Sequence, residues 1–203
     1  MPKRMFMILL LLALGLPVAA QEETAETVAK AYLAASQTGD WAKAATYMHP
    51  EALASLKRTF AAVIRLDKKN EAGKQLFNLK SNAEFEQLSP EAVFERMITG
   101  LTANIPMMKE LLADSNTTVI GQVPEAVDLI HIVYRMEMKM QNVPVTKLAV
   151  MSLKKSGNTW RMLLSGDMEA AFTSISKALE AQMNEPAPTP SKTAPTKRPV
   201  RKR

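Results

Sequence analysis

Three methionines that alternate along one segment offer the first chemistry to consider. Met136, Met138 and Met140 are separated by single residues, so in a strand their thioethers share one face. In a chain without cysteine such a run suggests copper(I), which soft thioether ligands select. The same face carries Ile130 and Ile132, and methionine fills irregular core space well. We therefore favour core packing, or the lining of an apolar ligand site, over copper for this methionine stripe.

Motifs for other metals, for nucleotides and for acyl transfer are absent from the sequence. No His-x3-5-His spacing suggests zinc, and no dense carboxylate cluster suggests calcium. Glycine-rich nucleotide loops, a Walker loop, Gly-x-Ser-x-Gly and His-Glu-x-x-His are missing as well. We therefore expect no cofactor. His131 shares strand parity with Arg135, Glu137 and Lys139, so it should face solvent or a partner surface.

The charge of the chain is concentrated at its ends. The 203 residues carry a net charge of +6, from 26 Lys and Arg against 20 Asp and Glu. Two of the cations lie in residues 1–20 and six in residues 186–203, which leaves −2 for residues 21–185. A body with this charge is not a basic domain that coats nucleic acid.

The last segment, residues 185–203, is rich in proline and should be disordered with polyproline II character. We call it the basic tail. Its cations are Lys192, Lys197, Arg198, Arg201, Lys202 and Arg203. Cations near anionic lipid contribute about 1 kcal/mol each. The tail is therefore a candidate anchor to an anionic envelope surface, and a solvated extension without function is the alternative.

A secretory signal peptide is predicted over residues 1–20. A short basic start precedes an apolar run over residues 6–16, and Val18-Ala19-Ala20 supplies small residues before a cleavage site. The apolar run is shorter than the roughly 20 residues that a membrane-spanning helix needs. We expect cleavage before Gln21 and export to the periplasm or the medium. The mature protein should be soluble, and without cysteine it has no disulfide.

Helical periodicity dominates the first half of the body. Apolar residues recur at helical spacing over residues 24–36, 41–48, 50–64 and 90–98. Asp40 is a natural N-cap for the second of these helices. Residues 67–88 are mixed and predict a loop with at most one short helix. Gly100 is expected to end the last long helix, and residues 105–113 predict a further helical turn.

The period changes to two after Asp114. The alternating segments, rich in valine, isoleucine, threonine and methionine, are residues 117–123, 129–140, 143–154 and 159–165. The breaks between them are short, so consecutive strands should pair as an antiparallel meander. A last helix is expected over residues 167–183. Helices followed by strands, without alternation, indicate an α+β fold, with one domain over residues 21–184.

Several of these segments carry a family resemblance. Val28-Ala29-Lys30-Ala31-Tyr32-Leu33, the run 38–44 and Met48-His49-Pro50-Glu51 resemble the start of nuclear transport factor 2-like (NTF2-like) domains. Residues 130–135 and 157–166 resemble the central strands of exported, uncharacterised members. The resemblance implies a cone, in which N-terminal helices pack in a curved antiparallel four-stranded sheet around a pocket. The expected C-terminal helix departs from family members that end in a strand.

The resemblance also indicates where a site would lie. NTF2-like enzymes use a pocket carboxylate or histidine with a tyrosine for proton transfer, so the resemblance makes Tyr47, His49 and Tyr134 catalytic candidates. We favour a structural role, with His49 capping a helix and the tyrosines in the core, because no carboxylate is placed by spacing to orient the imidazole. Met136 and Trp160 complete the expected ligand pocket, because Trp160 shares parity with inward-facing neighbours.

These features favour an exported, non-enzymatic NTF2-like domain that binds a small apolar or amphipathic ligand, or a protein partner. The alternative is an isomerase or lyase with His49 as general base and a tyrosine as acid. A homodimer that packs sheet against sheet is a third interpretation. Whether the domain is an enzyme is left open by the sequence, because fold alone does not choose a chemistry.

Overall fold

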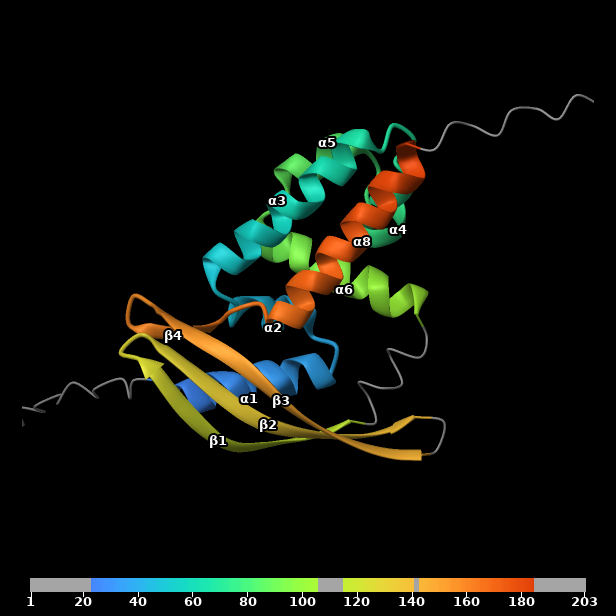
Figure 1. The fold of residues 1–203 in the computed structure, drawn as a ribbon. Helices are drawn as coiled ribbons and strands as arrows, with labels where there is room; N and C mark the ends of the chain where they lie inside the picture. Colours follow the sequence, from blue (N-terminus) through green and yellow to red (C-terminus); the bar gives the residue numbers. More distant parts are fainter. Residues whose placement is uncertain (1–22, 106–114, 141–142, 185–203) are drawn as a thin grey trace, which may run out of the picture.

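Helices and strands occupy separate parts of the chain in the structure, a computed structural model that describes residues 23–105, 115–140 and 143–184 (Figure 1). The helices before the sheet are α1 (Ala25–Gln37), α2 (Trp41–Thr46), α3 (Pro50–Leu66), α4 (Glu71–Phe77), α5 (Asn82–Gln87) and α6 (Pro90–Asn104). The later elements are β1 (Asn116–Ala126), β2 (Leu129–Met140), β3 (Val143–Ser156), β4 (Thr159–Met162) and α8 (Gly166–Asn184).

Side-chain caps determine where several helices begin. The Lys43 N–H donates to the Asp40 carboxylate over 3.0 Å at the start of α2. The Ala92 N–H donates to the Ser89 hydroxyl over 3.2 Å at the start of α6. Each cap satisfies an N–H that has no partner within its helix. The predicted cap at Asp40 is therefore confirmed.

Four phenylalanines hold the helical layer together. The rings of Phe60 and Phe77 meet edge to face with centroids 5.5 Å apart, and those of Phe77 and Phe85 do so at 5.2 Å. Phe172 of α8 contacts Phe60 at 6.4 Å. Edge-to-face pairs of this kind contribute beyond the apolar area they bury. These rings join α3, α4, α5 and α8 into one core.

The prediction of a loop with at most one short helix over residues 67–88 is wrong, because α4 and α5 both form there. The buried Asp67 carboxylate accepts the N–H groups of Glu71 and Gly73, each over 2.9 Å. It thereby supplies hydrogen-bond acceptors to the first turn of α4. Asn70, at φ 55°, takes the left-handed conformation that turns the chain into that helix.

Gly100 does not end α6, which continues to Asn104. The glycine lies where α6 crosses α4, and a Cβ atom there would stand 2.3 Å from the Leu76 carbonyl oxygen. Its missing side chain therefore permits a close helix contact. The sequence pattern shows a glycine but not the backbone that approaches it.

The sheet is an antiparallel meander in the order β1-β2-β3-β4, as predicted. β1 is longer than expected, since it continues through Pro124 and Glu125 to Ala126. Register shifts after Val119 and after Pro124 accommodate the irregular pairing with β2. β1 is an edge strand, and there a proline that cannot donate a ladder hydrogen bond is tolerated. β4 is shorter than expected and ends at Met162.

The structure has a helical layer above a curved sheet, and α1 lies against the sheet (Figure 1). α1 contacts all four strands, whereas α3 and α6 pack on other helices. The buried side chains of the sheet cluster toward β4: Ile130, Ile132, Met151, Leu153 and Met162. A parallel bridge between Met48 and Met162 joins the start of the helical layer to β4.

The predicted fold class is confirmed: helices come first, a curved four-stranded antiparallel sheet follows, and a C-terminal helix ends the body. The predicted signal peptide over residues 1–20 and the basic tail lie outside the described residues, as does the helical turn predicted over residues 105–113 apart from Ile105. Among the described helices, none is both long enough and apolar enough to cross a membrane.

Candidate functional site

A groove of about 360 Å³ separates α1 from the edge strand β1. Its lining consists of Lys30, Leu33, Ala34, Gln37, Thr117, Thr118 and Val119. We call it the α1–β1 groove. The lining contains both apolar and polar residues, so the groove can offer an apolar surface and hydrogen-bonding groups.

The helical period of α1 places one wall of the groove. Lys30, Leu33, Ala34 and Gln37 stand at i, i+3, i+4 and i+7 and therefore lie on one helix face. The Gln37 side-chain amide donates to the Ser115 carbonyl over 3.2 Å, which ties the end of α1 to the start of the sheet. Lys30 pairs with Glu26 one turn earlier on α1 at 2.6 Å.

Two tyrosines lie beside the groove lining. Tyr134 of β2 is the register partner of Val119, and Tyr32 precedes Leu33 on α1. Burial raises the pKa of the Tyr32 phenol to about 12, the Ser36 side chain offsets part of that rise, and Tyr134 close by adds to it. Burial also raises the pKa of Tyr134. Both phenols therefore stay neutral at physiological pH and act there as hydrogen-bonding groups without charge.

The methionine stripe continues along the same face of β2. Met136 and Met138 are half-buried, and Met136 is the register partner of Thr117 in the groove. The side chain of Met140 lies outside the described part of the structure, so the copper interpretation stays a prediction. Among the described residues, no group of three or more histidine and carboxylate side chains could hold a metal ion.

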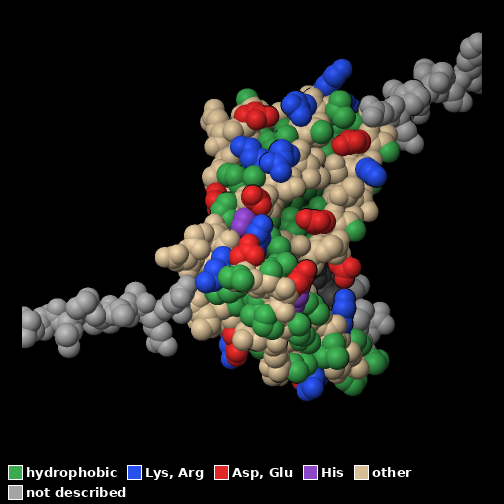
Figure 2. All heavy atoms as spheres, turned by 60° about the vertical axis from the view of Figure 1, so that its left-hand side comes forward, with side chains coloured by type: hydrophobic (Ala, Val, Ile, Leu, Met, Phe, Trp, Pro, Cys, Tyr) green, Lys and Arg blue, Asp and Glu red, His purple; other side chains and the backbone are tan. Residues whose placement is uncertain are grey.

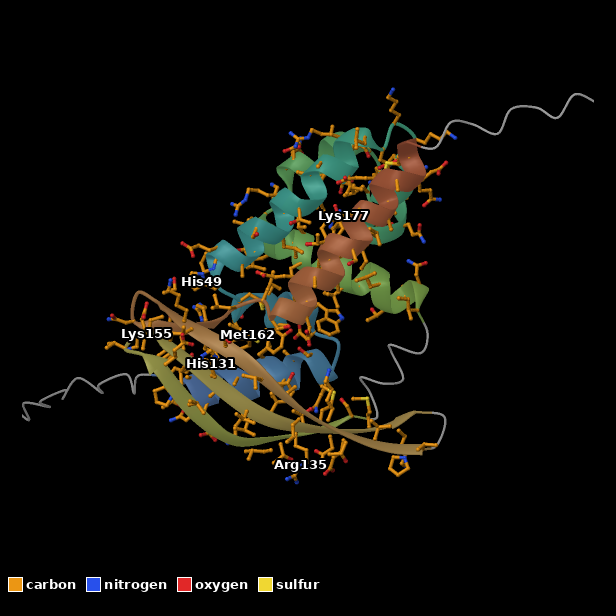
Figure 3. All side chains as sticks on the ribbon, viewed as in Figure 1. His49, His131, Arg135, Lys155, Met162 and Lys177 are labelled. Atoms are coloured by element: carbon orange, nitrogen blue, oxygen red, sulfur yellow. The ribbon has the colours of Figure 1, made fainter. Side chains whose placement is uncertain are left out.

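His49 is the N-cap residue of α3 and is buried at 7% exposure. The Glu51 N–H donates to its Nδ1 over 3.3 Å, which makes the imidazole a helix cap. The backbone N–H of His49 donates to the Met162 carbonyl over 2.7 Å, and the backbone N–H of Met162 donates to the Tyr47 carbonyl over 2.8 Å. These backbone bonds join His49 and Tyr47 to β4, and Figure 3 shows His49 close to Met162.

Trp160 lies on β4, two residues before Met162, and is half-buried. The Lys155 ammonium stands 5.3 Å from its ring centroid, a distance at which a cation attracts an aromatic face.

The residues of the expected pocket lie in two places in the structure. Tyr134 and Met136 lie on β2 beside the α1–β1 groove, while Tyr47, His49 and Trp160 gather at β4.

A second hollow of about 530 Å³ opens next to His49, between the start of α3 and the connection from β4 to α8. Its lining is Glu51, Ala52, Ser55, Arg58, Leu163, Leu164 and Glu169. Acidic and basic groups are mixed around it. The arrangement selects neither an anionic nor a cationic ligand.

Sequence reasoning missed one cluster, on the face of the sheet turned away from Ile132. His131 Nδ1 lies 2.9 Å from the Ser152 hydroxyl, and the Glu125 carboxylate accepts a hydrogen bond from His131 Nε2. Parity alone indicated that His131 faces outward, and the structure places it there with its side chain 26% exposed. The partners could not be read from the sequence, because they come from neighbouring strands.

Comparison with known proteins gives a match among solved structures. No protein-family model matches the chain, and no curated protein matches it. Among solved structures, the chain is similar to an NTF-2-like protein of unknown function from Shewanella oneidensis. The TM-score is 0.37 and the identity 15%, over 68% of this chain and 89% of that chain. A likeness of this size carries no argument about function.

Proposed function

We propose that this chain is an exported binding domain of the NTF2-like kind that holds a small amphipathic molecule in the α1–β1 groove. The observation that carries the proposal is the groove itself, about 360 Å³ of space with a mixed lining. Small-molecule sites are typically concave, range from about 300 to 1,000 Å³ and combine an apolar wall with a few polar groups. The groove lies at the lower end of that range.

The lining favours a ligand with an apolar body and one polar end. Leu33, Ala34 and Val119 supply the apolar wall. Thr117 shares the inward face of β1 with Val119. Its hydroxyl makes no hydrogen bond to any of the described residues, so it can donate to or accept from a ligand. Lys30 at the rim is paired with Glu26, and a ligand anion can share this ammonium.

A fluorescent amphiphile tests the proposal directly. The probe is anilinonaphthalene sulfonate, which combines apolar rings with one anionic group. Ala34→Phe fills the groove from an exposed helix position, and we expect it to weaken probe binding at least about tenfold, or about 1.4 kcal/mol. Ala42→Phe is the matched control, because Ala42 is also an exposed alanine on a helix, α2. Equal probe affinity in the two variants would exclude the groove as the binding site.

Self-association through the sheet is a second proposal, favoured by one observation. Ile120, Val123, Leu148 and Val150 are each half or more exposed. Figure 2 shows hydrophobic side chains gathered over the lower part of the molecule, where the sheet lies. A large exposed apolar patch commonly marks an interaction site. Sedimentation over a range of protein concentrations tests this proposal, and Leu148→Lys should shift the chain toward the monomer.

We also propose that the basic tail attaches to an anionic envelope surface and that the predicted signal peptide directs export. The isomerase or lyase alternative gains no support from the geometry of His49. Its ring is buried and its Nδ1 accepts the Glu51 N–H, so that nitrogen is engaged as a cap rather than aimed at a substrate.

A further inference from the structure

Three side chains from three neighbouring strands meet on the outer face of the sheet, away from the α1–β1 groove: Glu125 of β1, His131 of β2 and Ser152 of β3. We propose that they form a nucleophilic site in which Ser152 takes acyl groups from esters of apolar carboxylic acids. A carboxylate, an imidazole and a serine hydroxyl in hydrogen-bonded series are the groups that such chemistry needs, on whatever fold they occur.

The sheet positions all three side chains. His131 and Ser152 are register partners on β2 and β3, and the Ser152 hydroxyl lies 2.9 Å from His131 Nδ1. Glu125 lies in the register shift between Pro124 and Ala126, and its carboxylate reaches the far side of the same imidazole, at Nε2. The Ser152 carbonyl also accepts the Leu163 N–H over 2.8 Å, which holds β3 at this point.

These contacts determine where the protons lie when the imidazole is neutral. A carboxylate oxygen only accepts, so His131 Nε2 must carry the proton of the bond to Glu125. Nδ1 is then the unprotonated nitrogen, and the bond between it and Ser152 must be donated by the serine hydroxyl. The carboxylate thereby fixes the tautomer in which the imidazole is a base toward Ser152.

The neighbours of Ser152 divide the face into an apolar and a cationic side. Val150, two residues before Ser152, is exposed and is the register partner of Val133. Lys154, two residues after it, is the register partner of Arg161 on β4. Like charges opposite one another repel, and neither makes an ion pair within the described part of the chain. An acyl chain fits the apolar side, and a developing oxyanion fits the cationic side.

The reaction balances without a cofactor. The Ser152 oxygen forms a bond to the acyl carbon while its proton moves to His131 Nδ1. The leaving alcohol then departs with that proton, which leaves an ester on Ser152. Water, activated by the same nitrogen, hydrolyses this ester to the carboxylic acid and restores the hydroxyl. Glu125 is a positioning residue, because it acts through the imidazole.

The site is open to reagents, since the side chains of His131 and Glu125 are 26% and 60% exposed. The test uses a fluorophosphonate, which phosphonylates activated serines, and p-nitrophenyl butyrate as the ester. Both are applied to the mature chain at a concentration at which it sediments as a monomer. Ser174 on α8 is the control, because it is exposed and its hydroxyl donates to the Ala170 carbonyl over 2.8 Å rather than to a base.

We expect one phosphonyl group on Ser152 and none on Ser174, located by mass spectrometry of peptides. His131→Gln should slow labelling and ester hydrolysis by about 10²-fold or more, which is the usual contribution of a general base. Glu125→Gln should slow both reactions, and Glu125→Asp should recover part of the loss. Each variant is compared with the parent chain by its melting temperature.

Equal labelling of Ser152 and Ser174 would overturn the proposal. So would His131→Gln reacting as fast as the parent chain. The comparison between the two serines is made within the unmodified sequence, so it decides the question even if a variant fails to fold. Probe binding in the α1–β1 groove is measured separately and does not depend on this result.

Discussion

Replacing Tyr32 by phenylalanine should change how the stability of the domain depends on alkaline pH. Burial raises the pKa of this phenol from 10.0 to about 12 in the folded chain, whereas the unfolded chain keeps the ordinary value. The neutral phenol is therefore favoured in the folded state. Its stabilising contribution is complete below pH 10 and is lost as the pH rises from 10 to about 12.

The size of the effect follows from the shift. One pKa unit corresponds to about 1.4 kcal/mol, so a rise of about two units corresponds to roughly 2 to 3 kcal/mol lost across that pH range. Tyr32→Phe has no phenol to ionise at this position. Its free energy of unfolding should fall less steeply with pH than that of the parent chain, by up to roughly 1.4 kcal/mol per pH unit above pH 10.

Urea denaturation followed by tryptophan fluorescence measures this difference at a series of pH values. Phenolate absorbance in the near ultraviolet reports the ionisation itself, and one phenol should titrate late in the folded parent chain and be missing from Tyr32→Phe. Burial also raises the pKa of Tyr134. The double variant Tyr32→Phe with Tyr134→Phe should therefore show the weakest dependence of stability on alkaline pH. If the free energies of unfolding of the parent chain and of Tyr32→Phe fell in parallel with pH, the claim that burial raises the pKa of the Tyr32 phenol would be refuted.

Three further predictions concern the core, the methionine stripe and the basic tail. Gly100→Ala should destabilise the domain by about 1 to 3 kcal/mol, because the new Cβ would stand 2.3 Å from a backbone carbonyl oxygen. The measurement is the denaturation midpoint, and the control is Gly121→Ala, whose new Cβ would meet nothing within 4 Å. Replacing all three methionines of the stripe by leucine should cost below about 1.5 kcal/mol per site, and copper(I) binding that this variant abolishes would contradict core packing. Deleting residues 186–203 should leave the melting temperature unchanged and abolish co-sedimentation with anionic vesicles at low salt; vesicle binding by the shortened chain would place the attachment in the folded body.

Local signals in the sequence were sufficient for most of the fold. Asp40 and Ser89 cap helices through hydrogen bonds to residues three positions on, so their effect is visible in a short window. Period-two alternation likewise located the strands, because side-chain parity is a property of each strand alone. These elements need no knowledge of distant contacts.

The features that could not be predicted depend on local turn geometry, on strand register and on the packing of distant segments. The start of α4 uses Asp67, four residues before its first residue, in place of an adjacent cap. Tyr32 and Tyr134 come together because α1 crosses the sheet. Glu125 reaches His131 through a register shift in β1, at a point where Pro124 predicted the end of the strand. Residue types and their spacing do not encode these arrangements.

The central claim is that the α1–β1 groove holds a small amphipathic molecule, and native mass spectrometry of the chain purified from its own cells tests it most directly. We expect the mature protein to carry an additional small mass that is released when the protein is denatured. This mass should be absent from Ala34→Phe and retained by Ala42→Phe. A parent chain that carries no added mass and takes up no anilinonaphthalene sulfonate would contradict the claim, as would a bound molecule that both variants retain equally.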